Sequence, residues 1–149
     1  MGIRRPQRDT PPPGWPQDHD RPRVLVEAWD GALRWAEEGF LEREGFEVRS
    51  CAGPEGLGAA RCPLAVGDGC ALAEGADVIY NQLGLRPKTH RDVAVALRAQ
   101  FPNTPIVLEV SIDEAKREAE LLDAFHVETG ATTGRGVVEG VKRALEATP

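Results

Sequence analysis

The sequence predicts an α/β domain with a doubly wound, five-stranded parallel sheet and helices on both faces. Three observations favour it: five short segments suit strands, five segments with helical spacing alternate with them, and glycine, proline or capping residues separate them. At 149 residues, the chain has the length of a single domain.

Three of the strands are expected in the first half of the domain. Residues 23–26 are a short apolar run of the kind that is covered on both faces, residues 46–51 alternate, and residues 76–80 form another apolar run. A helix that stops at Gly45 is indicated by apolar residues at helical spacing, namely Leu33, Ala36, Phe40 and Leu41. Residues 52–75 have weak periodicity and predict one or two short helices within a loop.

The second half continues the alternation. A helix over 93–101 ends at Pro102, and residues 106–110 form the fourth strand. Asp113 or Ser111 caps the next helix, and a fifth strand lies around residues 126–128. The inner faces of the last two helices are predicted at Ala115, Ala119, Leu122 and Phe125, and at Val137, Val141 and Leu145. Right-handed crossovers then favour a flavodoxin-like strand order.

A Pro/Arg-rich segment precedes this domain. Residues 1–22 hold six of the chain's 12 prolines and almost no aliphatic side chains. Such a composition buries too little surface to offset the entropy of ordering, so residues 1–21 are expected to be a disordered tail and residues 22–149 a single domain. Trp15 is interpreted as a side chain on this tail, or as an anchor for a partner.

Charge and composition exclude several classes of function. The net charge is −6; residues 1–23 carry five Arg and three Asp, or +2, so the remainder carries −8. An acidic domain without a basic stripe argues against nucleic-acid binding. Neither a membrane-spanning run nor a secretory signal is found, so the chain is expected to be cytoplasmic.

Three junctions resemble those of response-regulator receiver domains. The resemblance lies in Leu41-Glu42-Arg43-Glu44-Gly45-Phe46-Glu47-Val48, in Ala76-Asp77-Val78-Ile79 and in Asn103-Thr104-Pro105-Ile106-Val107. It spans about residues 23–147 and implies the three-layer receiver fold. Receiver chemistry needs an acidic pair for Mg²⁺, a phosphate-accepting Asp, a Ser or Thr that senses the phosphate, and a Lys.

At the matching positions most of these residues are replaced. Glu27-Ala28-Trp29-Asp30 lacks the adjacent acidic pair, and the acceptor position falls on Asn81 or Gln82. Ser111 stands near the sensing position, but no Lys occurs between Lys116 and Lys142. The resemblance therefore implies a degenerate receiver, or pseudo-receiver, that is not phosphorylated on Asp.

All three cysteines fall between the second and third expected strands. Cys51 ends a strand at the edge where doubly wound folds bind ligands, and Cys70 is placed to open a short helix. With Cys62, and with His90 or His126, they could form a Cys₃His zinc site, or they could hold an iron–sulfur cluster. The spacing lacks a close cysteine pair, so a redox-active pair such as Cys62–Cys70 and simple buried packing stay open alternatives.

Two weaker candidate sites lie at the carboxyl edge of the sheet. Thr132, Thr133, Gly134 and Arg135 precede the last helix and could hold an anion, although a plain capped turn is the simpler account. Glu27, Asp30, Glu109 and Ser111 could gather around a hard cation, with Asp30 as a helix cap being the simpler account. His90 is expected to be solvated in the first turn of a surface helix.

The function expected from the sequence is therefore regulatory and not enzymatic. No Ser/His/Asp or Cys/His/Asn set is apparent, and no cofactor is expected beyond the zinc or iron–sulfur cluster considered above. In ordinary receivers, the last two helices and the strand between them dock partners, so the resemblance implies residues 113–146 as the surface for a protein partner or a second copy. A metal or thiol sensor built on Cys51, Cys62 and Cys70 is the alternative function.

Overall fold

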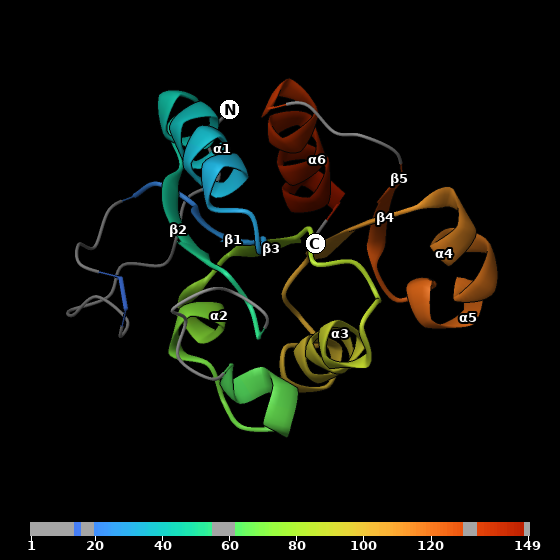
Figure 1. Ribbon diagram of the computed structural model, residues 1–149. Helices are drawn as coiled ribbons and strands as arrows, with labels where there is room; N and C mark the ends of the chain where they lie inside the picture. Colours follow the sequence, from blue (N-terminus) through green and yellow to red (C-terminus); the bar gives the residue numbers. More distant parts are fainter. Residues whose placement is uncertain (1–13, 16–19, 55–61, 130–133, 148–149) are drawn as a thin grey trace.

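A five-stranded parallel sheet forms the centre of the protein, as the computed structural model in Figure 1 shows. The structure describes residues 14–15, 20–54, 62–129 and 134–147. The strands are β1 (Arg23–Glu27), β2 (Glu47–Cys51), β3 (Val78–Asn81), β4 (Ile106–Val110) and β5 (His126–Thr129). Their order is β2-β1-β3-β4-β5 with all neighbours parallel, which confirms the predicted doubly wound, flavodoxin-like sheet.

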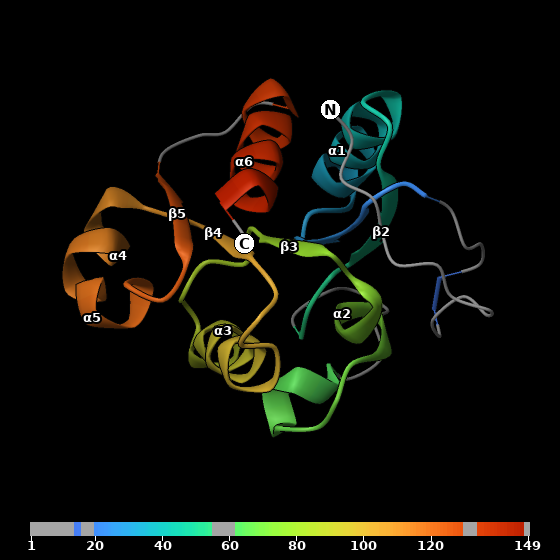
Figure 2. The same ribbon diagram turned by 180° about the vertical axis from the view of Figure 1, so that it is seen from behind.

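Helices cover both faces of this sheet. They are α1 (Gly31–Arg43), the 3₁₀ helix η1 (Pro63–Val66), α2 (Ala71–Gly75), α3 (Lys88–Gln100), α4 (Ile112–Arg117), α5 (Ala119–Leu122) and α6 (Gly134–Ala147). Helices α1 and α6 lie side by side on one face, and α2 and α3 lie on the other, in both views (Figures 1 and 2). No helix in the described ranges is long and apolar enough to cross a membrane.

Alternation along the strands divides the core into two layers. The layer under α1 and α6 takes its strand residues from Val24, Val26, Val48, Val78, Tyr80 and Val107. The layer under α2, α3 and η1 takes them from Leu25, Ile79, Ile106, Leu108 and Val110. Successive strand residues point to opposite faces, so the side chains at the carboxyl ends of the strands also divide between the two layers.

Two expectations about the helices need adjustment. The helix expected after Ser111 is broken in two, because Glu118 between α4 and α5 has a non-helical backbone with φ −112° and ψ 25°. In α1, the predicted apolar face is only partly buried: Leu41 is buried as expected, but Leu33 and Phe40 are exposed by 39% and 42%, and Glu37 is buried in their place. The two short helices expected within residues 52–75 are present as η1 and α2, and residues 55–61 lie outside the described part.

Trp15 belongs to the core, so its interpretation as a side chain on a disordered tail is wrong. It is 2% exposed, and its indole Nε1 donates a hydrogen bond to the Leu72 carbonyl at 3.1 Å. The Arg23 guanidinium lies 5.7 Å from the centre of its ring. The large apolar indole gains more by burial here than the short segment around it loses in ordering. Apart from residues 14, 15, 20 and 21, the predicted tail 1–21 lies outside the described residues.

Candidate functional site

The carboxyl ends of β2, β1 and β3 bring three polar side chains together. Glu27 is paired in register with Cys51 on one side and with Asn81 on the other. Glu27 and Asn81 stand two residues after Leu25 and Ile79, which point into the layer under α2 and α3, so they point into the same layer. Cys51 is in register with Glu27 and points the same way. We call Glu27, Asn81 and Cys51 the Glu27 group.

Glu27 is enclosed and hydrogen-bonded within this group. It is 1% exposed, and Asn81 is fully buried beside it. The Asn81 Nδ2 donates to Glu27 Oε1 at 3.0 Å, while the Asn81 Oδ1 accepts from the Leu83 N–H at 3.0 Å. Burial raises the pKa of Glu27 to about 7, although the Asn81 and Cys51 side chains partly offset this. Both ends of the Asn81 amide are therefore occupied by protein groups.

The three cysteines are free thiols, and two of them are held protonated. The Cys51 Sγ lies 3.9 Å from Glu27 Oε2. Burial raises the pKa of Cys51, and the charges of Glu27, Cys70 and Cys62 raise it further. Burial likewise raises the pKa of Cys70, with Glu27 and Cys62 adding to the effect. Thiolates are the nucleophiles and metal ligands, so this environment opposes both reactivities at neutral pH.

The histidines considered as a fourth zinc ligand are both engaged elsewhere. His90 is 4% exposed, so the expectation of a solvated residue is wrong; its Nδ1 lies 3.0 Å from the carbonyls of Leu83 and Arg86. His126 opens β5, which lies at the opposite edge of the sheet from the strand that ends in Cys51. Within the described ranges, no group of three or more His, Cys, Asp or Glu side chains could hold a metal ion. The zinc and iron–sulfur predictions stay predictions, and elemental analysis of the purified protein tests them.

Asp30 and Ser111 act as helix caps. The Asp30 Oδ1 accepts from the N–H groups of Ala32 and Leu33 at 2.9 and 3.1 Å. Ser111 forms a capping box with Glu114 at the start of α4. Both side chains thus satisfy backbone donors that a helix start leaves unpaired. The predicted gathering of these two residues with Glu27 and Glu109 is not observed.

Glu109 instead belongs to a second polar group on the opposite face of the sheet. Its Oε2 accepts from the Tyr80 hydroxyl at 3.0 Å and from the Gln82 Nε2 at 2.9 Å. Tyr80 and Glu109 point into the layer under α1 and α6, from which Glu37 approaches. We call Glu37, Tyr80, Gln82 and Glu109 the Glu37 group.

Glu37 is the residue that the sequence analysis missed. It is 1% exposed, and neither of its carboxyl oxygens has a hydrogen-bond partner among the residues that the structure describes. Burial raises the pKa of Glu37 to about 7. The polar amide of Gln82 partly offsets this shift, and the charge of Glu109 adds to it. Glu37 stands four residues before Leu41 and so shares its face of α1. That spacing was the available signal.

The predicted anion site is only partly described. Thr132 and Thr133 lie outside the described residues, and α6 begins at Gly134. The Arg135 side chain is 89% exposed and lies 3.8 Å from Glu139, one turn along α6. An exposed pair of this kind adds little stability. Anion binding at this loop stays a prediction.

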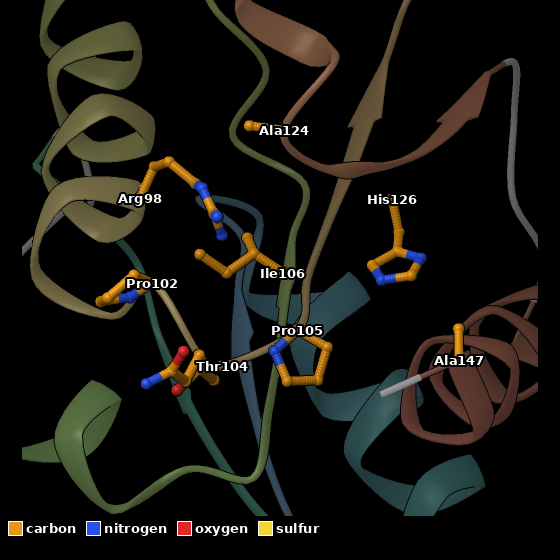
Figure 3. Close-up of a pocket in the computed structure, with 9 residues that line it drawn as sticks. Arg98, Pro102, Thr104, Pro105, Ile106, Ala124, His126 and Ala147 are labelled. Atoms are coloured by element: carbon orange, nitrogen blue, oxygen red, sulfur yellow. The ribbon is translucent and has the colours of Figure 1, made fainter. Parts of the chain in front are cut away.

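A shallow cavity of about 390 Å³ lies at the other end of the sheet. Figure 3 shows Arg98, Pro105, Ile106 and His126 around it, near the starts of β4 and β5. Apart from His126, it includes none of the candidate site residues that the sequence suggested. It is therefore separate from both polar groups at the carboxyl edge.

Comparison with known proteins decides the fold. Neither a family model nor a curated protein matches this sequence. Among solved structures, the receiver domain of Francisella response regulator 1452 is 17% identical, with a TM-score of 0.63 over 87% of this chain and 100% of that one. The chemotaxis protein CheY4 of Vibrio cholerae is 19% identical, with a TM-score of 0.60 over 84% and 99%. The chain has the fold of a response-regulator receiver domain.

This receiver-like chain also matches one part of a larger regulator. NtrX from Brucella abortus is 15% identical, with a TM-score of 0.64, and the match covers 86% of this chain but 27% of NtrX. Identities in this range show the shared fold and leave the chemistry to be argued from the site. In the receiver-like fold, the Glu27 group occupies the carboxyl ends of β1 and β3.

Proposed function

We propose that the protein is a non-catalytic pseudo-receiver that regulates by binding another protein and is not phosphorylated on Asp. The protein has a receiver fold, and the polar side chains at the carboxyl edge of its sheet already form hydrogen bonds with other protein groups. Receiver domains serve generally in signalling, which gives the proposal its regulatory class.

The observation that carries the proposal is the environment of Asn81. The receiver resemblance expects the phosphate-accepting Asp at the end of the third strand, at Asn81, where β3 ends, or at Gln82, which follows it. A carboxamide cannot form an acyl phosphate. The Asn81 side chain is also fully buried. Its Nδ2 donates a hydrogen bond to Glu27, and its Oδ1 accepts one from the Leu83 N–H.

The neighbouring positions support the same conclusion. Glu27 stands where the acidic pair for Mg²⁺ is expected, but it is enclosed. Burial raises its pKa to about 7, so protons compete with cations for this carboxyl near neutral pH. Ser111 caps α4 and bonds to Glu114. No lysine follows β5 before Lys142, so a phosphoryl group there would lack its counter-charge.

The experiment is incubation of the purified chain with acetyl phosphate and Mg²⁺, followed by intact mass measurement. We expect no change in mass, while a phosphorylatable receiver domain treated in parallel gains about 80 Da, one phosphoryl group. A stable adduct of that mass on this chain would overturn the proposal. Peptide mapping of such an adduct would then identify the acceptor residue.

The surface proposed for the partner includes α4, α5, β5 and α6, within residues 113–146. Strand β5 is an edge strand, and Val127 on it is 37% exposed. Ile112, at the adjoining start of α4, is 60% exposed. Exposed apolar side chains beside an open strand edge suit a protein partner or a second copy of this chain.

A further inference from the structure

The cavity at the amino ends of β4 and β5 is lined by several elements that are far apart in the sequence. Arg98 comes from the last turn of α3, His126 opens β5, and Ala147 ends α6. The loop that enters β4 supplies Asn103 and Thr104. The volume of about 390 Å³ is within the range of roughly 300–1,000 Å³ that is typical of small-molecule sites.

This cavity crosses the end of the sheet from one helical layer to the other. His126 is in register with Val107, whose side chain lies in the layer under α1 and α6, so His126 points to that side. Arg98 approaches from α3, which covers the opposite face. In Figure 3, both side chains extend toward the space beside Ile106, at the start of β4. A small molecule bound in this space can therefore contact both.

The fold does not use the polar side chains of this cavity. Within the described part of the chain, neither a hydrogen bond nor an ion pair engages the side chains of Arg98, Asn103, Thr104 and His126. By contrast, Arg91, seven residues earlier on α3, pairs with Glu118 at 3.3 Å. Arg98 is half-buried, and a guanidinium that no protein carboxylate neutralises is available to an external anion.

The charge of this cavity is opposite to that of the protein as a whole. The chain has a net charge of −6, yet none of the described residues that line the cavity is Asp or Glu. The carboxyl ends of α3 and α6 lie here, and the partial negative charge of a helix end opposes an anion. Arg98 carries the permanent positive charge of the lining, so an anion in the cavity depends on Arg98.

We infer that the cavity binds a small organic anion, a carboxylate or a phosphate monoester with an apolar body. The planar guanidinium of Arg98 donates two parallel hydrogen bonds to such a group. The His126 imidazole and the Thr104 hydroxyl each add one donor. The apolar body contacts the remaining wall, which consists mainly of Pro102, Pro105, Ile106, Ala124 and Ala147.

This site differs from the phosphate and magnesium positions expected of a receiver. Those positions lie at the carboxyl edge of the sheet, where Glu27 is bonded to Asn81. The cavity lies at the amino edge, around the starts of β4 and β5. Anion binding here is independent of the proposed pseudo-receiver function, because it needs neither a phosphorylated residue nor a protein partner.

The test is an NMR titration of the isotope-labelled full chain at pH 7 and constant ionic strength. Benzoate and phenyl phosphate are the anionic probes, and benzyl alcohol and benzylamine are their neutral and cationic counterparts. We expect the anions to shift the amide signals of Thr104, Ile106 and His126 in a saturable way, with a Kd of about 1 mM or lower. The neutral and cationic compounds should give no saturable shift up to about 10 mM. The tighter of the two anions identifies the head group.

Matched variants test the role of each donor. Arg98→Met keeps the apolar stem and removes the charge, so it should raise the Kd for both anions about tenfold or more. Arg91→Met removes the same charge from the same face of α3, two turns or about 10 Å away, and should keep the Kd within about twofold. His126→Leu removes a single donor and should raise the Kd about threefold or more.

Three outcomes overturn the inference. They are the absence of saturable binding of both anions at about 10 mM, equal binding of benzyl alcohol, and an unchanged Kd in Arg98→Met. Inorganic phosphate provides a further control, since it lacks the apolar body; its binding as tightly as phenyl phosphate would also contradict an organic ligand. The spectrum of each variant shows whether it is folded. If Arg98→Met fails to fold, an unchanged Kd in His126→Leu overturns the inference instead.

Discussion

Protonation of Glu27 makes the free energy of unfolding depend on pH. In the unfolded chain its pKa has the ordinary value of 4.5, whereas burial raises the folded value to about 7. Folding therefore takes up a proton between these two values. The free energy of unfolding falls as the pH rises from about 4.5 to about 7 and is then independent of this group.

Replacing Glu27 with Gln should remove this dependence. The amide keeps an oxygen for the Asn81 donor but carries no charge to bury. The variant should match the wild type near pH 5 and exceed its free energy of unfolding by up to about 3 kcal/mol at pH 8. Urea denaturation at both pH values measures the difference.

The matched control is Glu74→Gln, an exposed glutamate of α2 on the same side of the sheet. It should change stability by no more than about 0.5 kcal/mol at either pH. Since Glu37 also has a raised pKa, the Glu27 variant should keep part of the wild-type slope. A wild-type slope left wholly unchanged by Glu27→Gln would contradict the assignment.

At the scale of elements, the strands were predictable and the polar groups were only partly so. Buried parallel strands are nearly continuous apolar runs, and such runs located β1, β3 and β4, while alternation located β2, and β5 was expected around residues 126–128. Register then explains why Glu27, Cys51 and Asn81 meet, since each ends its strand. The sequence alone could not show their burial, which depends on the helices and loops packed over that edge.

Helix α1 shows where sequence patterns are insufficient. It has more apolar residues than positions that face the sheet, so the sequence is compatible with more than one buried face of this helix. The structure turns Glu37 inward and leaves Trp35 exposed by 77%. Ordinary preferences for burial predict the reverse, so apolar spacing alone assigns the wrong face to this helix.

The proposed partner surface leads to a prediction at the same scale. Glutamate at both Ile112 and Val127 places charge on two exposed apolar side chains of α4 and β5. If a second copy is the partner, sedimentation should show self-association of the wild type at about 100 μM and a monomeric double variant. If another protein binds, cross-linking in the native cell should capture it with the wild type and lose it with the variant.

Val95→Glu is the matched control for this pair. Val95 is 42% exposed on α3, a helix that is not part of the proposed surface, so this variant should behave as the wild type. All variants should unfold with similar stability, because exposed substitutions change it by about 0.5 kcal/mol or less. Equal loss of association in Val95→Glu would indicate a general effect of charge and contradict the surface assigned.

Considered as a whole, the molecule has one edge with two separate polar groups. Successive side chains of a strand point to opposite faces of the sheet, so Glu27 and Asn81 lie in one layer and Gln82 and Glu109 in the other. The two polar groups therefore pack against different helices.

The segment before β1 also contributes to the whole fold, through Trp15. Its indole is 2% exposed and packs in the layer under α2 and α3, with its N–H bonded to Leu72. Trp15→Ala should lower the free energy of unfolding by about 3–5 kcal/mol in urea denaturation, because it leaves a cavity and an unpaired carbonyl. Trp35→Ala, at a site that is 77% exposed, should lower it by about 0.5 kcal/mol or less. Equal small losses in both variants would mean that the N-terminal segment does not pack on the domain in solution.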